Sequence, residues 1–144
     1  MKLSDIQQQW SVDCEVDDTS LDQESLKLPN LHSKYLSYWN EENLNYKKWK
    51  SHYYILYKKK WEYYSGKMDE DALEQEGWEP FQLKILKQDI EIYLKGDKDI
   101  IDIQSKIDYT KQKIDALDQI IKSISNRGYL IKNAIDFMRF QMGS

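Results

Sequence analysis

The chain has 144 residues, a length that fits one domain, and its 25 acidic and 21 basic residues give a formal net charge of −4 at pH 7. Its single cysteine, Cys14, excludes a disulfide framework and a zinc knuckle. The N-terminal stretch MKLSDIQQQW lacks a long apolar region, and no run approaches the length of a membrane span. We therefore expect neither a signal peptide nor a membrane helix.

Few glycines and prolines, together with little period-two alternation, predict an all-α fold. We expect an elongated helical bundle with two long helices, built as a single helical domain over residues 1–144. Residues 1–18 are predicted to form a short N-terminal helix followed by an acidic arm. A basic and aromatic helical segment over 20–66 follows, in which Pro29 either kinks a helix or lies in its first turn. Gly66 stands where this helix is expected to end.

The second half of the chain is predicted to contain two more helices. Residues 67–79 read as a linker with at most one short helical turn, and a helix is expected over 80–95, before Gly96. Asp97 is then predicted to cap a long helix over 97–140. Further acids in its first turns match the helix dipole, which is a better explanation than a metal site.

The last helix shows apolar residues at alternating steps of three and four, the a/d pattern of a coiled coil over about six heptads. Isoleucine at most a and d positions favours a bundle of more than two strands. We expect this seam to serve both an internal bundle and subunit assembly. Gly128 interrupts it, and either admits a close neighbour or marks a kink. The residues expected at the assembly interface are Ile114, Leu117, Ile121, Ile124, Ile131, Ile135 and Met138.

Basic charge is concentrated in the middle of the chain. Residues 1–33 carry 2 lysines and 7 acids, residues 34–67 carry 8 lysines and 3 acids, and residues 68–144 carry 11 bases and 15 acids, which gives segment charges of −5, +5 and −4. Such asymmetry indicates an interaction surface.

A helical wheel separates the side chains of the middle helix into two faces. Most aromatic residues fall on one face, and Lys47, Lys48, Lys58 and Lys59 fall on the other. Lys60 interrupts the aromatic stripe. Either the stripe is core, with Lys60 reaching water near the helix end, or the end of the helix projects and stacks on unpaired bases.

No motif indicates catalysis. There is no P-loop, and His32 and His52 lie twenty residues apart without a metal-binding context. The carboxylates around Cys14 disfavour a reactive thiolate. We expect a protein that is not an enzyme and holds no metal or cofactor.

The run WEYYSGKM (61–68) and the lysines before it resemble the central motif of the UvsY recombination mediators of T-even-like bacteriophages. The segments WEPFQLKILKQDIEIYL (78–94) and SNRGYLIKNAIDF (125–137) are similar to those of cyanophage members. The resemblance runs from about residue 18 to residue 140. One departure is the three consecutive lysines followed by Trp61, where better-known members have an alternating basic pattern and an aliphatic residue.

The resemblance implies a non-enzymatic protein that binds single-stranded DNA and helps a phage RecA-like recombinase displace the phage single-stranded-DNA-binding protein. It implies a ring of six or seven subunits, a C-terminal helix used in assembly, and action in the cytoplasm of the infected bacterial host. Lys58 and Lys60 correspond to DNA contacts of the family. A structural helical-bundle adaptor without nucleic-acid binding is the alternative. The full set expected to bind single-stranded DNA is Lys47, Lys48, Lys58, Lys59, Lys60, Trp61, Tyr63, Tyr64 and Lys67.

Overall fold

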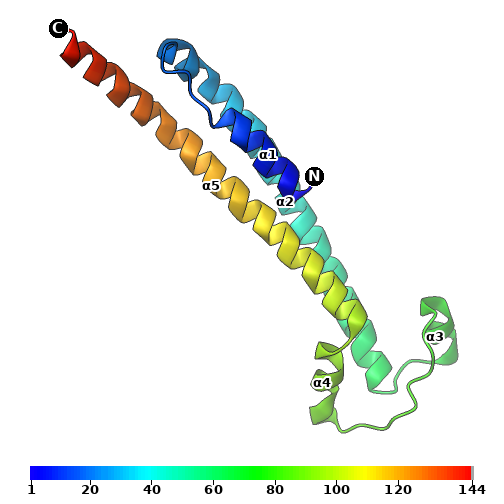
Figure 1. The fold of residues 1–144 in the computed structure, drawn as a ribbon. Helices are drawn as coiled ribbons and strands as arrows, with labels where there is room; N and C mark the ends of the chain where they lie inside the picture. The colour runs from blue at the N-terminus through cyan, green and yellow to red at the C-terminus, as the bar shows by residue number, and fades with distance from the viewer. Residues whose placement is uncertain (144) are drawn as a thin grey trace. The chain divides into compact units, whose positions relative to one another are not determined.

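The computed structural model describes residues 1–143, so that Ser144, the last residue of the predicted domain, lies outside the described residues. Its helices are α1 (Leu3–Asp13), α2 (Leu21–Tyr64), α3 (Glu70–Glu76), a short 3₁₀ helix η1 (Lys87–Asp89), α4 (Ile90–Lys95) and α5 (Lys98–Gln141) (Figure 1). Residues 1–143 contain no strand, and the prediction of an all-α fold with two long helices is confirmed. Among the same residues, no helix combines the length and the apolar character that crossing a membrane requires.

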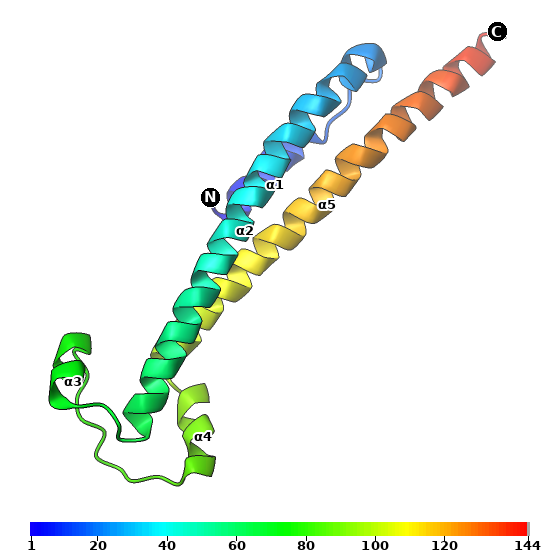
Figure 2. The ribbon, with the colours of Figure 1, turned by 180° about the vertical axis from the view of Figure 1, so that it is seen from behind.

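The chain divides into two compact units. Unit 1 comprises Met1–Asn45 and Thr110–Ser144, and unit 2 comprises Tyr46–Tyr109. Helices α2 and α5 have 44 residues each and contribute to both units. Within unit 2, α3 and α4 lie on opposite sides of the end of α2, as the view from behind shows (Figure 2). The expectation of a single domain stays a prediction.

Helix α2 begins at Leu21 and runs without a break through Pro29, which lies inside the helix. The alternative that Pro29 lies in the first turn of a helix is therefore wrong, because eight residues of α2 precede it. The alternative that Pro29 kinks the helix stays a prediction. At its other end the chain reverses at Gly66, whose φ of 74° lies in the left-handed region that favours glycine. The Lys67 amide donates to the Glu62 carbonyl at 2.9 Å, which closes the last turn.

The helix predicted over 80–95 is much shorter in the structure, because residues 78–86 form no helix. Phe81 packs its ring against Tyr63 and Tyr64, with centroid distances of 5.7 and 5.0 Å. These tertiary contacts hold the segment in a non-helical path and delay the helix to α4. The short turn expected in the linker is α3, which Asp69 caps by accepting a hydrogen bond from the Ala72 amide at 2.8 Å.

Unit 1 encloses the first hydrophobic core. Its buried members come from α1, α2 and α5, namely Ile6, Tyr35, Leu117, Ile120 and Ile124. The side chain of Arg127 donates to the Asp13 carbonyl at 2.9 Å and fixes the end of α1. A Cβ at Gly128 would lie 3.7 Å from Leu28, an ordinary contact, and α5 continues through this position without a break. Burial of each large apolar side chain contributes about 1.5–3 kcal/mol.

Unit 2 has a second, more aromatic core. Ile90 and Leu94 of α4 and Ile100 of α5 are buried against half-buried side chains of α2, which are Tyr53, Leu56, Trp61 and Tyr64. The aromatic stripe of α2 is therefore core over these turns.

Candidate nucleic-acid interface

The lysine face of α2 is the surface formed by Lys47, Lys48 and Lys58 in unit 2, and all three side chains are exposed. The Lys58 side chain is 79% exposed, and its ammonium lies 4.0 Å from the Glu62 carboxylate. An i,i+4 pair at this distance contributes at most about 0.5 kcal/mol, so it leaves Lys58 available for a stronger anion. Three lysine ammonium groups on one side of a helix can neutralise phosphate charges by electrostatic attraction alone.

Lys59 and Lys67 each have a partner from a nearby segment. The Lys59 ammonium lies 2.6 Å from the Glu76 carboxylate of α3, and its side chain is about half exposed. The exposed Lys67 places its ammonium 4.5 Å from the centroid of the Trp61 ring, a cation–π distance. Binding of DNA to either lysine would therefore compete with a contact within the chain.

Lys60 lies in a different environment from its neighbours, because its side chain is only 7% exposed. Its ammonium lies 3.1 Å from the Asp97 carboxylate and 2.9 Å from that of Asp99. The ring of Trp78 covers it, with 4.1 Å from ammonium to centroid. A cation already enclosed by two carboxylates and a ring is poorly placed to meet a phosphate. The structure thus places Lys60 inside unit 2, and its predicted DNA contact stays untested.

Asp97 connects Lys60 to the start of α5. Its carboxylate accepts from the Ile100 amide at 3.1 Å, which is the helix cap predicted from the sequence. It also accepts from the Tyr64 hydroxyl at 2.6 Å. Burial alone would raise the pKa of Asp97, but the hydrogen bonds from Tyr64, Ile100 and Lys60 outweigh it and lower that pKa. Burial and the bond to Asp97 raise the pKa of the Tyr64 hydroxyl.

Tyr63 and Tyr64, both expected to stack on bases, belong to an aromatic cluster of unit 2. The Tyr63 ring lies 5.4 Å from that of Trp78, and its hydroxyl donates to the Glu79 carbonyl at 2.5 Å. The Tyr64 ring lies 5.7 Å from that of Tyr93. Because their rings pack against other aromatic side chains within unit 2, a structural role is favoured for both tyrosines.

Two aromatic side chains that were not expected in the site are exposed beside the lysine face. Tyr54 is 62% exposed and Tyr57 is 36% exposed. On a helical wheel Tyr54 lies at the edge of the aromatic stripe, next to Lys47 and Lys58, and this position is the signal in the sequence that could have found it.

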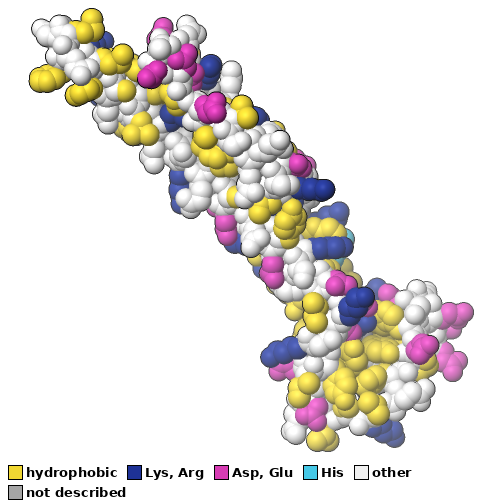
Figure 3. Space-filling view, in the orientation of Figure 1, with side chains coloured by type: hydrophobic (Ala, Val, Ile, Leu, Met, Phe, Trp, Pro, Cys, Tyr) yellow, Lys and Arg dark blue, Asp and Glu magenta, His cyan; other side chains and the backbone are white. Residues whose placement is uncertain are grey.

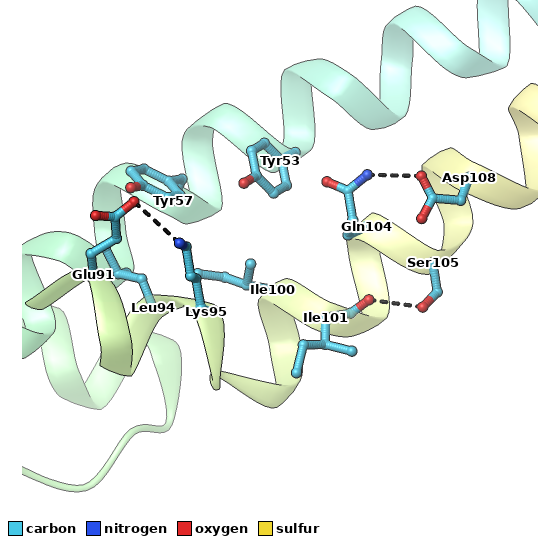
Figure 4. Close-up of a pocket in the computed structure, with 10 residues that line it drawn as sticks. All are labelled: Tyr53, Tyr57, Glu91, Leu94, Lys95, Ile100, Ile101, Gln104, Ser105 and Asp108. Atoms are coloured by element: carbon cyan, nitrogen blue, oxygen red, sulfur yellow. Dashed lines mark hydrogen bonds and ion pairs between the residues drawn. The ribbon is translucent and has the colours of Figure 1, made fainter.

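A groove of about 420 Å³ lies beneath Tyr57 in unit 2 (Figure 4). Apolar side chains of Leu94, Ile100 and Ile101 line it together with the two tyrosine rings of Tyr53 and Tyr57. On its polar rim the Lys95 ammonium lies 3.7 Å from the Glu91 carboxylate. The Asp108 carboxylate, also on the rim, accepts a hydrogen bond from the side-chain amide of Gln104 at 2.9 Å. With more carboxylates than lysines, the groove itself is unsuited to a phosphate.

The residues expected at an assembly interface lie in unit 1 and differ in exposure. Four of them are buried within the chain itself, namely Ile114, Leu117, Ile124 and Ile131. Ile121 and Ile135 are half-buried, and Met138 is exposed. Apolar side chains crowd the surface at the C-terminal end of α5 (Figure 3), where Tyr129, Leu130, Phe137, Met138, Phe140 and Met142 are exposed. The first part of the seam is thus packed within the chain, whereas the end of α5 leaves apolar side chains exposed.

Within residues 1–143, no cluster of three or more histidine, cysteine, aspartate or glutamate side chains is arranged to hold a metal ion. Cys14 is a free, exposed thiol.

Comparison with known proteins finds relatives of this chain. The sequence profile of the family described as recombination, repair and ssDNA binding protein UvsY matches residues 9–144. The recombination protein uvsY of Enterobacteria phage T4 is 25% identical over 143 residues, which cover 99% of each chain. Two crystal structures of the bacteriophage T4 recombination mediator protein UvsY superpose with TM-scores of 0.87 and 0.86. The first is 25% identical, and the match covers 99% of this chain and 98% of that one. The second is 24% identical, and the match covers 97% of this chain and 99% of that one. The chain therefore belongs to the UvsY family of recombination, repair and single-stranded-DNA-binding proteins.

Proposed function

We propose that this protein is a non-enzymatic recombination mediator that binds single-stranded DNA through the lysine face of α2. It helps to load a RecA-like phage recombinase onto DNA covered by single-stranded-DNA-binding protein, in the cytoplasm of the infected bacterial host. The observation that carries the proposal is the exposure of Lys47, Lys48 and Lys58 on one side of α2. Membership of a family of single-stranded-DNA-binding proteins, and similarity to the recombination mediator of phage T4, support the same function.

The proposal includes a ring of six or seven subunits. The exposed apolar side chains at the end of α5 support assembly there, because contiguous apolar patches mark interaction sites. A ring multiplies the lysine face by the number of subunits, so that weak single sites act together through avidity. Avidity also reconciles DNA binding with a net charge of −4.

A salt titration of binding to a fluorescent single-stranded oligonucleotide tests the DNA-binding part. Loss of one phosphate contact lowers the slope of log K against log salt by about 0.7 for single strands. The triple variant Lys47→Ala, Lys48→Ala, Lys58→Ala should therefore bind more weakly, with a slope smaller by about 2 for each engaged subunit. The matched control is Lys122→Ala with Lys132→Ala, two exposed lysines of unit 1, which should bind as wild type.

Binding by the triple variant equal to that of the wild type would remove the lysine face as the site. Absence of binding by the wild type at low salt would leave the structural adaptor as the better function. Loading is tested separately by the rate at which a RecA-like recombinase forms filaments on DNA coated with single-stranded-DNA-binding protein. The full-length protein should raise that rate, and the triple variant should not.

A further inference from the structure

The exposed rings of Tyr54 and Tyr57 adjoin the lysine face of α2. Tyr54 follows Lys47 by seven residues and precedes Lys58 by four, and both spacings return to the same side of a helix. Tyr57 lies one turn further on, at the edge between this side and the groove of unit 2. The lysines and these two rings therefore form one continuous surface on a single rigid helix.

Neither ring is enclosed by its protein neighbours. Tyr54 meets Tyr53 edge-on, with 5.8 Å between centroids and 74° between ring planes. Tyr57 lies 5.9 Å from the same ring at a tilt of 34°. Their exposed fractions of 62% and 36% show that both rings keep surface that no neighbour covers, although Tyr57 also lines the groove of unit 2. Tyr63 and Tyr64, by contrast, have their rings in the aromatic cluster.

We propose that Tyr54 and Tyr57 form a stacking strip for unpaired bases, while Lys47 and Lys58 hold the phosphates of the same strand. This rests on the proposed function and assigns the base contacts of that site. The two rings are separated by about 4.5 Å along the helix axis, and the two lysines by about 16 Å. That length accommodates a few nucleotides of a strand lying along α2.

Stacking on a ring face does not read sequence, because every base has a π-face. It does require that the base be unpaired. The strip therefore gives a preference for single strands over duplexes and for normal strands over strands without bases, whereas lysines alone give neither preference.

The experiment measures binding of the full-length protein to oligo-dT and to an abasic oligonucleotide of the same length and charge, at one salt concentration. Tyr54→Leu keeps an apolar side chain but removes the ring, and Tyr54→Phe keeps the ring as the matched control. Tyr54→Leu should weaken binding to oligo-dT by about 5-fold to 150-fold, the range that one aromatic stack gives. Its binding to the abasic strand should not change. The Tyr54→Leu, Tyr57→Leu double variant should bind the two strands alike.

Equal binding of oligo-dT by Tyr54→Leu and the wild type would overturn the strip, as would equal affinity of the wild type for the two strands. In both cases salt-dependent binding through the lysines would remain, so the proposed function would stand. A wild type that binds neither strand at low salt would overturn both. Circular dichroism of each variant checks the fold, which should survive because Tyr54 lies on the surface.

Discussion

Lys58 and Lys60 lie two residues apart on the same helix and have opposite environments. The side chain of Lys58 is 79% exposed beside one distant carboxylate, whereas that of Lys60 is 7% exposed between Asp97 and Asp99. Two residues turn an α-helix by about 200°, which carries a side chain from the solvent face to the core face. A run of like charges can therefore place one lysine in solvent and another in the interior of the fold.

The largest expected effect is on stability at Lys60. Lys60→Met keeps the length of the side chain but leaves the buried Asp97 carboxylate without its cation. Removing one partner of a buried ion pair costs about 3–5 kcal/mol. Urea denaturation should show this loss, and Lys58→Ala should unfold at the wild-type midpoint. Wild-type stability of Lys60→Met together with weakened DNA binding would reverse the roles assigned to the two lysines.

A smaller loss of stability is expected on substitution of Tyr64, whose hydroxyl donates a hydrogen bond to the Asp97 carboxylate. Tyr64→Phe keeps the ring in the aromatic cluster and removes only that donor. Hydrogen bonds to charged groups contribute about 1.5–3 kcal/mol, and the free energy of unfolding should fall by that amount. Tyr57→Phe is the matched control on the exposed edge. If both substitutions had the same small effect, the network around Asp97 would not stabilise unit 2.

Acid pH should weaken the same network further. The folded pKa of Asp97 lies below its ordinary value of 3.8, so its ionised form stabilises the folded state. That contribution is fully present above the ordinary value and is lost as pH falls through the folded pKa. Thermal unfolding followed from neutral to acid pH should show a shallower acid decline in Asp97→Asn than in wild type. An identical decline in the two proteins would exclude Asp97 as a contributor.

The smallest effect on stability is expected at Lys58. Lys58→Ala should change the free energy of unfolding by no more than about 0.5 kcal/mol, because it is a surface substitution. It should reduce the salt slope of single-stranded DNA binding by about 0.7 for each engaged subunit. Fluorescence anisotropy against salt measures this slope, and an unchanged slope would remove Lys58 from the interface.

Much of the fold follows from local signals in the sequence. Gly66 ends α2 and Asp97 caps α5 because each needs only its neighbouring residues to do so. The helix predicted over 80–95 starts too early because Phe81 is held outside a helix by its contacts with Tyr63 and Tyr64. The periodicity of the sequence carries no information on such tertiary contacts.

In the candidate site, too, local sequence patterns predict part of the arrangement, and tertiary contacts decide the rest. The wheel predicts that Lys47, Lys48 and Lys58 share a face, and their exposure follows from it. It also places Lys60 in the aromatic stripe, but the carboxylates that enclose it come from the start of α5, more than thirty residues later in the sequence. Tyr63 and Tyr64 looked available for stacking because their partners Trp78 and Phe81 lie in a segment whose path the sequence did not predict.

Acetylation of each lysine, measured by mass spectrometry with and without single-stranded DNA, tests most directly whether DNA binds the lysine face of α2. We expect Lys47, Lys48 and Lys58 to react in the free protein and to be protected by the DNA. Lys60 should be unreactive in both states. A Lys60 that reacts in the free protein and is protected by DNA, with Lys47, Lys48 and Lys58 unaffected, would contradict this assignment.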